Sequence, residues 1–236
     1  MDLFAQPYLW TTIARLATVI LTATLAWITY QSNLLLKKFQ PDFNLLLSPP
    51  EVAVRIVLVG TCLLLAWLSG LPTRQLGLAI TRPLTHIVVG LIAGVTMQVS
   101  INLLTIGAVR LFGRDIYSPR VILNILPSRP LEWVLVPLAL LSAVAMEELL
   151  FRTLWIGGFS DIVPISLLII ATSLIFGIMH LPQGYLGVLV AAGLNILLSL
   201  LFLWTGGILA PLVAHYTINL LQIIMAHYQR DWLENY

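Results

Sequence analysis

The sequence predicts an all-α, polytopic integral membrane protein, a helical bundle of about seven to eight transmembrane helices. Hydrophobic residues make up 59% of the 236 residues and charged residues only 9%, whereas a soluble domain is about one-quarter charged. Apolar runs of about 20 residues, long enough to cross a bilayer, recur from one end of the chain to the other. Most charges and many prolines gather between these runs, where helices are expected to end.

Each predicted span is an apolar run with few charges, and helices are favoured over strands because membrane strands are short and alternate in polarity. The seven spans cover residues 9–30, 52–71, 84–109, 131–157, 163–181, 184–204 and 207–228. An eighth helix could lie in an interfacial stretch such as 121–126 or at a break within 131–157. We find no internal repeat and no flexible linker, so we expect one membrane-embedded domain over residues 1–236.

Composition also narrows the classes of function. The net charge of +2, with aromatic residues not interleaved with basic ones, argues against a nucleic-acid partner. Lys and Arg are densest in the first and third connectors, so the positive-inside rule predicts that these two connectors are cytoplasmic and that the N-terminus lies outside. Gly90 and Gly94 in the third span form a GxxxG pattern, which indicates close contact with another helix.

Several polar residues lie deep inside the spans of the second half, where a charge costs about 3 kcal/mol at the bilayer centre. They are Glu147, Glu148, Arg152, His180, Asn195, His215 and Asn219. Glu148 and Arg152 stand one helical turn apart, so we expect them to pair. Glu147 is rotated by about 100° from Glu148 and is left without a partner on its own helix.

Histidines are the natural partners for Glu147, and His215 stands one turn from Asn219 on the same face of its helix. Two imidazoles, a carboxamide and a free carboxylate could bind a metal, activate water or relay protons. Hydrogen bonds between helices are the structural alternative for each residue alone. The motifs HExxH and GxSxG are absent, as is a GxGD pattern, which disfavours the usual zinc helix and the serine and aspartyl protease sites.

Three motifs resemble those of the CPBP family of intramembrane proteases, the type II CAAX prenyl endopeptidases and their bacterial relatives in bacteriocin processing and immunity. "EELLFR" fits EExxxR, "FGIMH" fits FxxxH and "HYTIN" fits HxxxN, in that order over residues 147–219. The family-like core would cover about 131–228. Thr153 follows the arginine where the family often has glycine.

The resemblance implies peptide-bond hydrolysis within the bilayer, in a mostly eight-helix fold. By motif position Glu147 would be the general base, His180 would assist the water or bind a metal, and His215 with Asn219 would stabilise the oxyanion. Glu148 and Arg152 would hold the helix in place. The tentative metal ligands are Glu147, His180 and His215, with Zn²⁺ as the possible cofactor, and catalysis by glutamate and histidine without a metal is the alternative.

The substrate implied is a membrane-associated peptide or protein, such as a prenylated CaaX tail or a leader peptide, and the membrane implied is a bacterial plasma membrane or a related internal one. A proton- or ion-coupled transporter and a non-catalytic scaffold or immunity factor remain alternatives. One geometric difficulty is visible: ideal helices place His180 roughly 10–15 Å away in depth from Glu147 and His215.

Overall fold

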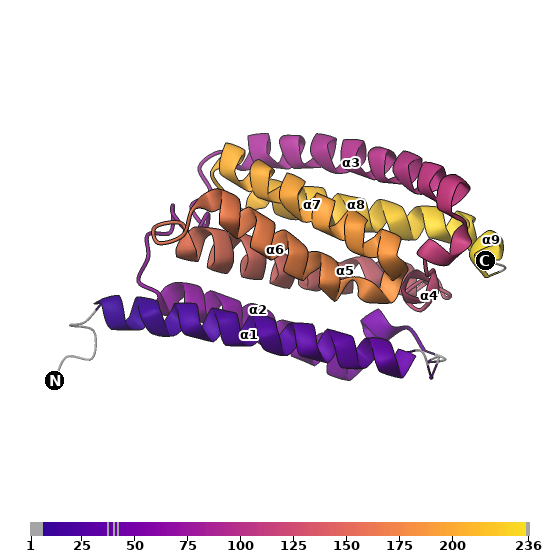
Figure 1. Cartoon of the computed structure of the whole chain (residues 1–236), viewed down its shortest axis with the longest axis horizontal. Coiled ribbons are helices and arrows are strands. Elements are labelled where there is room, and N and C mark those ends of the chain that lie inside the picture. Colours follow the sequence, from indigo (N-terminus) through magenta and orange to yellow (C-terminus); the bar gives the residue numbers. More distant parts are fainter. Residues whose placement is uncertain (1–6, 37, 40, 42, 235–236) are drawn as a thin grey trace.

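A computed structural model describes residues 7–36, 38–39, 41 and 43–234 and shows a bundle of long helices (Figure 1). Within these residues there is no strand, which confirms the all-α prediction. The long helices are α1 (Pro7–Leu36), α2 (Pro49–Leu68), α3 (Pro83–Phe112), α5 (Glu132–Glu148), α6 (Ile165–Met179), α7 (Gly184–Thr205) and α8 (Leu209–Tyr228). They correspond one to one with the seven predicted apolar spans.

Six of these helical segments are long and apolar enough to cross a membrane, and the remaining one, α6, has 15 residues. The chain is therefore a multi-pass membrane protein, as predicted. The other helical elements are short: η1 (Leu45–Leu47), η2 (Arg114–Ile116), α4 (Arg120–Leu123), η4 (Leu181–Gln183) and α9 (Arg230–Glu234). Of the two places proposed for an eighth helix, the interfacial stretch 121–126 overlaps the short helix α4, whereas the 131–157 span has no break.

The 131–157 span changes its winding instead of breaking. α5 passes directly into η3, a π-helix over Leu149–Gly157 that carries Arg152. π-Helical turns are rare and occur frequently at functional sites. The two acidic residues at the end of α5 therefore stand where the helix changes its hydrogen-bond register.

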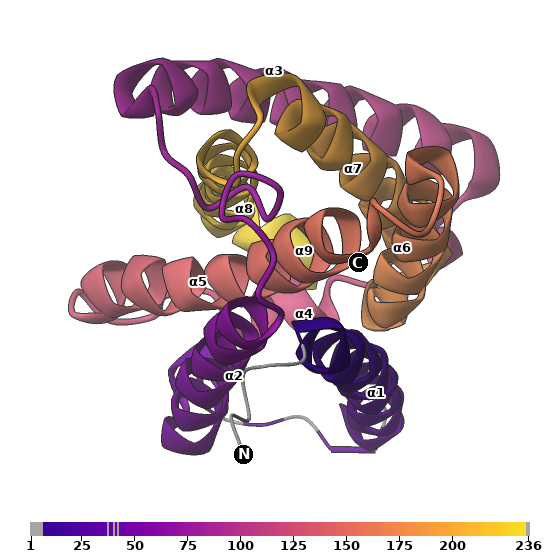
Figure 2. The same cartoon turned by 90° about the vertical axis from the view of Figure 1, so that its left-hand side faces the viewer.

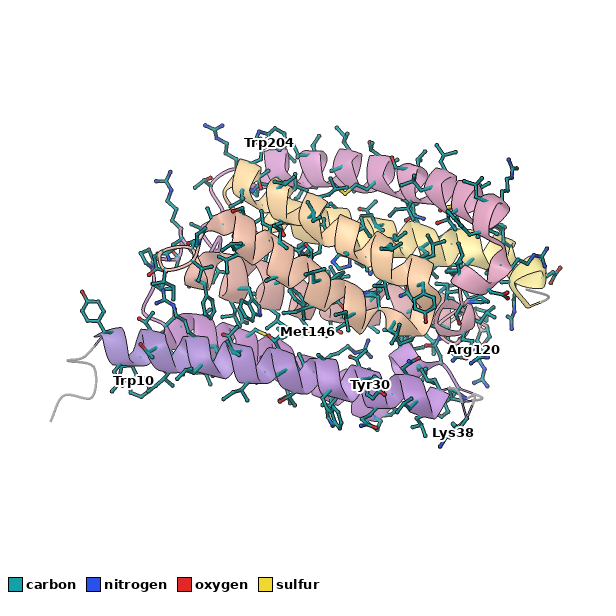
Figure 3. The ribbon with its side chains drawn as sticks, in the orientation of Figure 1. Trp10, Tyr30, Lys38, Arg120, Met146 and Trp204 are labelled. Carbon is teal, nitrogen blue, oxygen red and sulfur yellow. The ribbon has the colours of Figure 1, made fainter. Side chains whose placement is uncertain are left out.

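The two ends of the bundle differ in their side chains (Figure 3). Trp10 and Trp204 lie at one end, whereas Lys38 and Arg120 lie at the other. We call the second one the basic end. The first and third connectors, which carry Lys38 and Arg120, thus lie on the same side of the molecule, and the positive-inside rule predicts that this side is cytoplasmic.

α3 packs tightly along α8, and two glycines allow it, as the GxxxG pattern predicted; Figure 2 shows the two helices from the end of the bundle. A Cβ built on Gly90 would stand 2.7 Å from the carbonyl oxygen of Ala210, and one on Gly94 would stand 2.7 Å from that of Ala214. Side chains at either position would push the helices apart. This contact fixes the turn of α8 that carries His215.

We expect Gly94→Ala to lower the free energy of unfolding by about 1–3 kcal/mol, because the added methyl group overlaps a backbone oxygen that cannot move away alone. Gly107→Ala is the matched control, since nothing lies within 4 Å of a Cβ at that position of the same helix. There the gain in helix propensity is expected to stabilise the protein by up to about 1 kcal/mol. Thermal unfolding in detergent measures both, and equal stabilisation by the two alanines would contradict the close packing.

Candidate active site

The four predicted catalytic residues meet at one partly open cavity. It has a volume of about 370 Å³, and Glu147, His180, His215 and Asn219 all line it. Met146, a further lining residue, lies far from both ends of the bundle (Figure 3). The remaining walls are mainly apolar and come from every long helix except α2, so a water molecule inside would find its polar partners chiefly among a few side chains.

The depth difference expected for His180 does not separate it from the other residues. α6 ends at Met179, and His180 is its C-terminal cap at the start of the short turn η4. The ring of Phe176 lies 4.5 Å from the His180 ring and 6.1 Å from the His215 ring, measured between centroids. One aromatic ring therefore lies beside both imidazoles.

Glu148 and Arg152 form the predicted ion pair. Arg152 Nε lies 3.1 Å from Glu148 Oε2, and both side chains are completely buried. Arg152 also donates from Nη2 to the backbone oxygen of Asn195, at 3.4 Å. The pair neutralises two charges that would each be costly in the middle of a membrane protein.

Glu148 has a second partner that the sequence did not indicate. Its Oε1 lies 2.7 Å from His215 Nδ1, and Glu147 Oε2 lies 3.5 Å from His215 Nε2. The two adjacent glutamates thus contact opposite nitrogens of one imidazole. Helical spacing alone predicts that the two glutamates lie on different faces of α5. It could not show that the His215 ring, carried by α8, contacts both of them.

These contacts constrain where the protons are. Beside the guanidinium of Arg152, Glu148 is ionised, so His215 Nδ1 must donate to it. The other ring nitrogen, His215 Nε2, faces Glu147 across 3.5 Å.

Exposure separates the two glutamates. The side chain of Glu147 is 25% exposed, whereas that of Glu148 is fully buried. Since both Glu147 and Asn219 line the cavity, a reactant there can reach them. Glu148 is enclosed by its two partners and orients His215.

One ring nitrogen of His180 remains available for a hydrogen bond to a reactant. Its Nδ1 lies 2.7 Å from the backbone oxygen of Phe176, and a carbonyl oxygen can only accept, so Nδ1 carries the hydrogen. In the neutral ring Nε2 then has a lone pair, which can accept a hydrogen bond from a water molecule. His180 is thus suited to orient water rather than to donate to an oxyanion.

Asn195, whose role the sequence left open, anchors a buried polar layer behind the ion pair. Its Nδ2 donates to Ser173 Oγ at 3.0 Å and to Thr172 Oγ1 at 3.3 Å, and Ser199 donates to its backbone oxygen at 2.6 Å. The layer joins α6 to α7 at the level of Arg152. The available signal was the pair of small polar residues within the apolar run "LLIIATSLIF".

A three-ligand zinc site does not fit the geometry of the tentative ligand set. Within the part of the chain that the structure describes, no group of three or more His, Cys, Asp or Glu residues could hold one metal ion. His215 Nδ1 faces Glu148 and His180 Nδ1 faces a carbonyl, which leaves Nε2 as the remaining nitrogen of each ring. Catalytic zinc takes three protein ligands and leaves one position open. Glu147, His180 and His215 therefore do not form such a set here.

Comparison with known proteins agrees with the motif reading of this region. Residues 129–221 match the family model described as "Type II CAAX prenyl endopeptidase Rce1-like". The matched segment contains Glu147, His180, His215 and Asn219, whereas α1, α2 and α3 lie outside it. No curated protein and no solved structure matches the chain. The resemblance inferred from the three motifs is confirmed for this segment.

Proposed function

Because residues 129–221 match the Rce1-like family model, we propose that this chain is an intramembrane endopeptidase. It hydrolyses a peptide bond of a membrane-associated substrate with a water molecule that Glu147 activates. The observation that carries the proposal is the single cavity lined by Glu147, His180, His215 and Asn219. A general base, a water-orienting imidazole and an amide donor are the groups that metal-free amide hydrolysis requires.

In the proposed reaction, the carboxylate of Glu147 accepts a proton from water as the water oxygen bonds to the scissile carbonyl carbon. His180 Nε2 accepts the second hydrogen of that water and holds it in line. The carbonyl oxygen becomes an oxyanion, to which Asn219 Nδ2 and the protonated Nε2 of His215 donate. Each such donor is worth about 10²- to 10³-fold in rate. The proton on Glu147 then passes to the amine nitrogen as the C–N bond breaks.

Glu148 and Arg152 support this reaction without touching the substrate. Glu148 holds Nδ1 of His215, and this contact sets the orientation of the ring and its protonation. Arg152 in turn fixes Glu148 from the opposite side. Arg152, Glu148 and His215 thus form a series of contacts that ends at the cavity.

We propose that the reaction needs no bound metal, and a chelator tests this. Incubation with 1,10-phenanthroline followed by gel filtration is expected to leave the cleavage rate within about twofold of the untreated rate, because the base and donors are side chains. Metal analysis of the same samples serves as the control. A rate that falls with chelation and returns on addition of Zn²⁺ would contradict the metal-free reaction and favour the tentative ligand set.

The substrate we propose is a peptide held at or within the membrane, with a prenylated CaaX tail and a leader peptide as the two leading classes. The mainly apolar walls of the cavity suit an apolar side chain or a lipid group next to the cleaved bond. A bacterial plasma membrane or a related internal membrane is the proposed location.

Membranes that contain the wild-type chain or Glu147→Gln test the proposal. Mass spectrometry of peptide termini is expected to find new termini only with the wild-type chain. Reconstituted liposomes separate the alternatives: a Glu147-dependent proton flux without any cleaved peptide would point to a transporter. Biological activity that is unchanged in Glu147→Gln would point to a scaffold.

A further inference from the structure

A second hollow lies at the basic end, beside the catalytic cavity. It has a volume of about 640 Å³ and is lined by segments far apart in the sequence: the last turn of α1, residues within 114–123, the turn from η4 into α7, and Leu233. Arg120, one of the lining residues, marks this end of the bundle (Figure 3). The volume falls within the range of small-molecule sites.

The charged side chains that line this hollow have an excess of positive charge. Arg114 and Arg120 line it together with a single carboxylate, that of Asp115. An arginine guanidinium matches the oxygens of a phosphate or carboxylate with two parallel N–H donors. The excess charge therefore favours an anionic ligand.

A buried amide adds an observation that is independent of the charges. Asn33 is only 6% exposed and lines the hollow, yet none of the described residues forms a hydrogen bond with its side chain. Buried amide groups nearly always have hydrogen-bond partners, because an unpaired one loses its bonds to water. A ligand with oxygen atoms in the hollow would give the Asn33 Nδ2 group an acceptor.

The N-terminus of α7 lies at the same hollow. Gly184 and Tyr185, the first two residues of this 22-residue helix, line it, and no side chain caps the helix. N–H groups in the first turn of a helix lack partners within the helix and attract anions. Guanidinium groups, an amide and a helix N-terminus thus line one space.

The segments around the hollow are held in place by the fold itself. A Cβ on Gly184 would stand 2.7 Å from the backbone oxygen of Ile116, so η2 lies directly against the start of α7. Ser118 N–H donates to the backbone oxygen of Gln183 at 3.0 Å, and Ile122 of the same connector is part of a buried hydrophobic cluster. The donors are therefore positioned before any ligand binds.

The remaining walls favour a lipid over a free anion. Leu36, Leu123 and Leu181 line the hollow together with two prolines, so apolar walls stand beside the donors. An anionic phospholipid has the matching groups, since its charged phosphate is joined to hydrocarbon. The basic end is also the side predicted to be cytoplasmic, and basic pockets between transmembrane helices on that side bind anionic headgroups.

We propose that this hollow binds the headgroup of an anionic phospholipid. The phosphate oxygens accept hydrogen bonds from the guanidinium groups of Arg114 and Arg120, from Asn33 Nδ2 and from the first turn of α7. The glycerol part lies against the apolar walls. This binding site does not depend on the proposed protease function.

Native mass spectrometry of the purified full chain in detergent tests the site, because it counts the lipid molecules that stay bound. Phosphatidylglycerol and phosphatidylcholine are titrated separately. We expect phosphatidylglycerol, which carries the net negative charge, to bind at least roughly fivefold more tightly. Equal affinities for the two lipids would overturn the proposal.

Arg120→Gln is expected to weaken phosphatidylglycerol binding by about fivefold, as the loss of one arginine near an anionic lipid predicts. Arg110→Gln is the matched control: it removes the same charge from the last turn of α3, outside the hollow, and should change the affinity by less than about twofold. Equal weakening by the two variants would show that general surface charge attracts the lipid, and would overturn the site.

Asn33→Leu separates lipid binding from folding. It removes the amide donor, so phosphatidylglycerol is expected to bind about tenfold more weakly, as for a lost hydrogen bond to a charged group. Thermal unfolding without added lipid should not occur at a lower temperature, because no described residue bonds to this amide. Unchanged lipid affinity would overturn the role of Asn33, and so would a large loss of stability, since the fold itself would then need the amide.

Inorganic phosphate distinguishes a lipid from a soluble anion. It is added in excess to the wild-type chain with phosphatidylglycerol bound, and the remaining lipid is counted in the same way. We expect the lipid to stay bound, because its apolar part keeps its contacts with the leucine walls. Displacement of the lipid by inorganic phosphate would make the hollow a site for a soluble anion and would overturn the lipid site.

Discussion

Glu147→Gln is expected to lower kcat by about 10²- to 10⁴-fold with little change in KM, because the amide keeps the shape of the carboxylate but cannot accept a proton from water. Glu147 is the glutamate that lines the cavity, and its carboxylate lies 3.5 Å from His215 Nε2. Steady-state cleavage of a farnesylated CaaX-type peptide, or of any peptide identified by its termini, by the reconstituted protein measures both constants.

Glu132→Gln is the matched control for this experiment. Glu132 begins the same helix, accepts hydrogen bonds from Ser128 and does not line the cavity, so its loss should leave kcat within about twofold. A Glu147→Gln protein that keeps more than about a tenth of the wild-type kcat would contradict its role as general base.

Arg152→Met is expected to lower the free energy of unfolding by about 3–5 kcal/mol, since it leaves Glu148 buried without its cationic partner. The double variant Glu148→Gln/Arg152→Met removes both charges together and should recover a large part of that loss. Thermal or denaturant unfolding in detergent micelles measures the change.

A more exposed ion pair provides the comparison. Arg15 pairs with Asp161 at 2.5 Å, but their side chains are 15% and 45% exposed, so Arg15→Met should cost only about 0–1 kcal/mol. If Arg15→Met and Arg152→Met lowered the free energy of unfolding equally, burial of the ion pair would not determine the size of the loss. A double variant no more stable than Arg152→Met would show that the buried pair is not a unit.

Much of the architecture could be predicted, because each helix that crosses a membrane appears in the sequence as a run of apolar residues. The seven predicted spans match the seven long helices, with ends that differ by a few residues. The Glu148–Arg152 pair followed from one helical turn of spacing. The continuous π-helical winding of Leu149–Gly157 could not be read in the same way, because no residue in "LLFRTLWIG" marks a change of hydrogen-bond register.

The parts of the site that the sequence missed all depend on how helices face one another. The 2.7 Å contact between Glu148 and His215 joins residues 67 positions apart, and nothing in either motif requires it. The first three helices lie wholly outside the three motifs, although Leu25 of α1 and Gln98 of α3 also line the cavity. Spacing along one helix gives its faces, but only packing shows which faces meet.

The short helix α6 has a consequence for the surrounding lipid. Its 15 residues extend about 22 Å, whereas the hydrocarbon core of a bilayer is about 30 Å thick. A hydrophobic segment shorter than the bilayer is accommodated by local thinning of the membrane. We expect headgroups and their hydration water to lie closer to His180, at the end of α6, than they would at a full-length span. Hydrophobic mismatch at a single helix is thus a route by which water reaches a mainly apolar cavity.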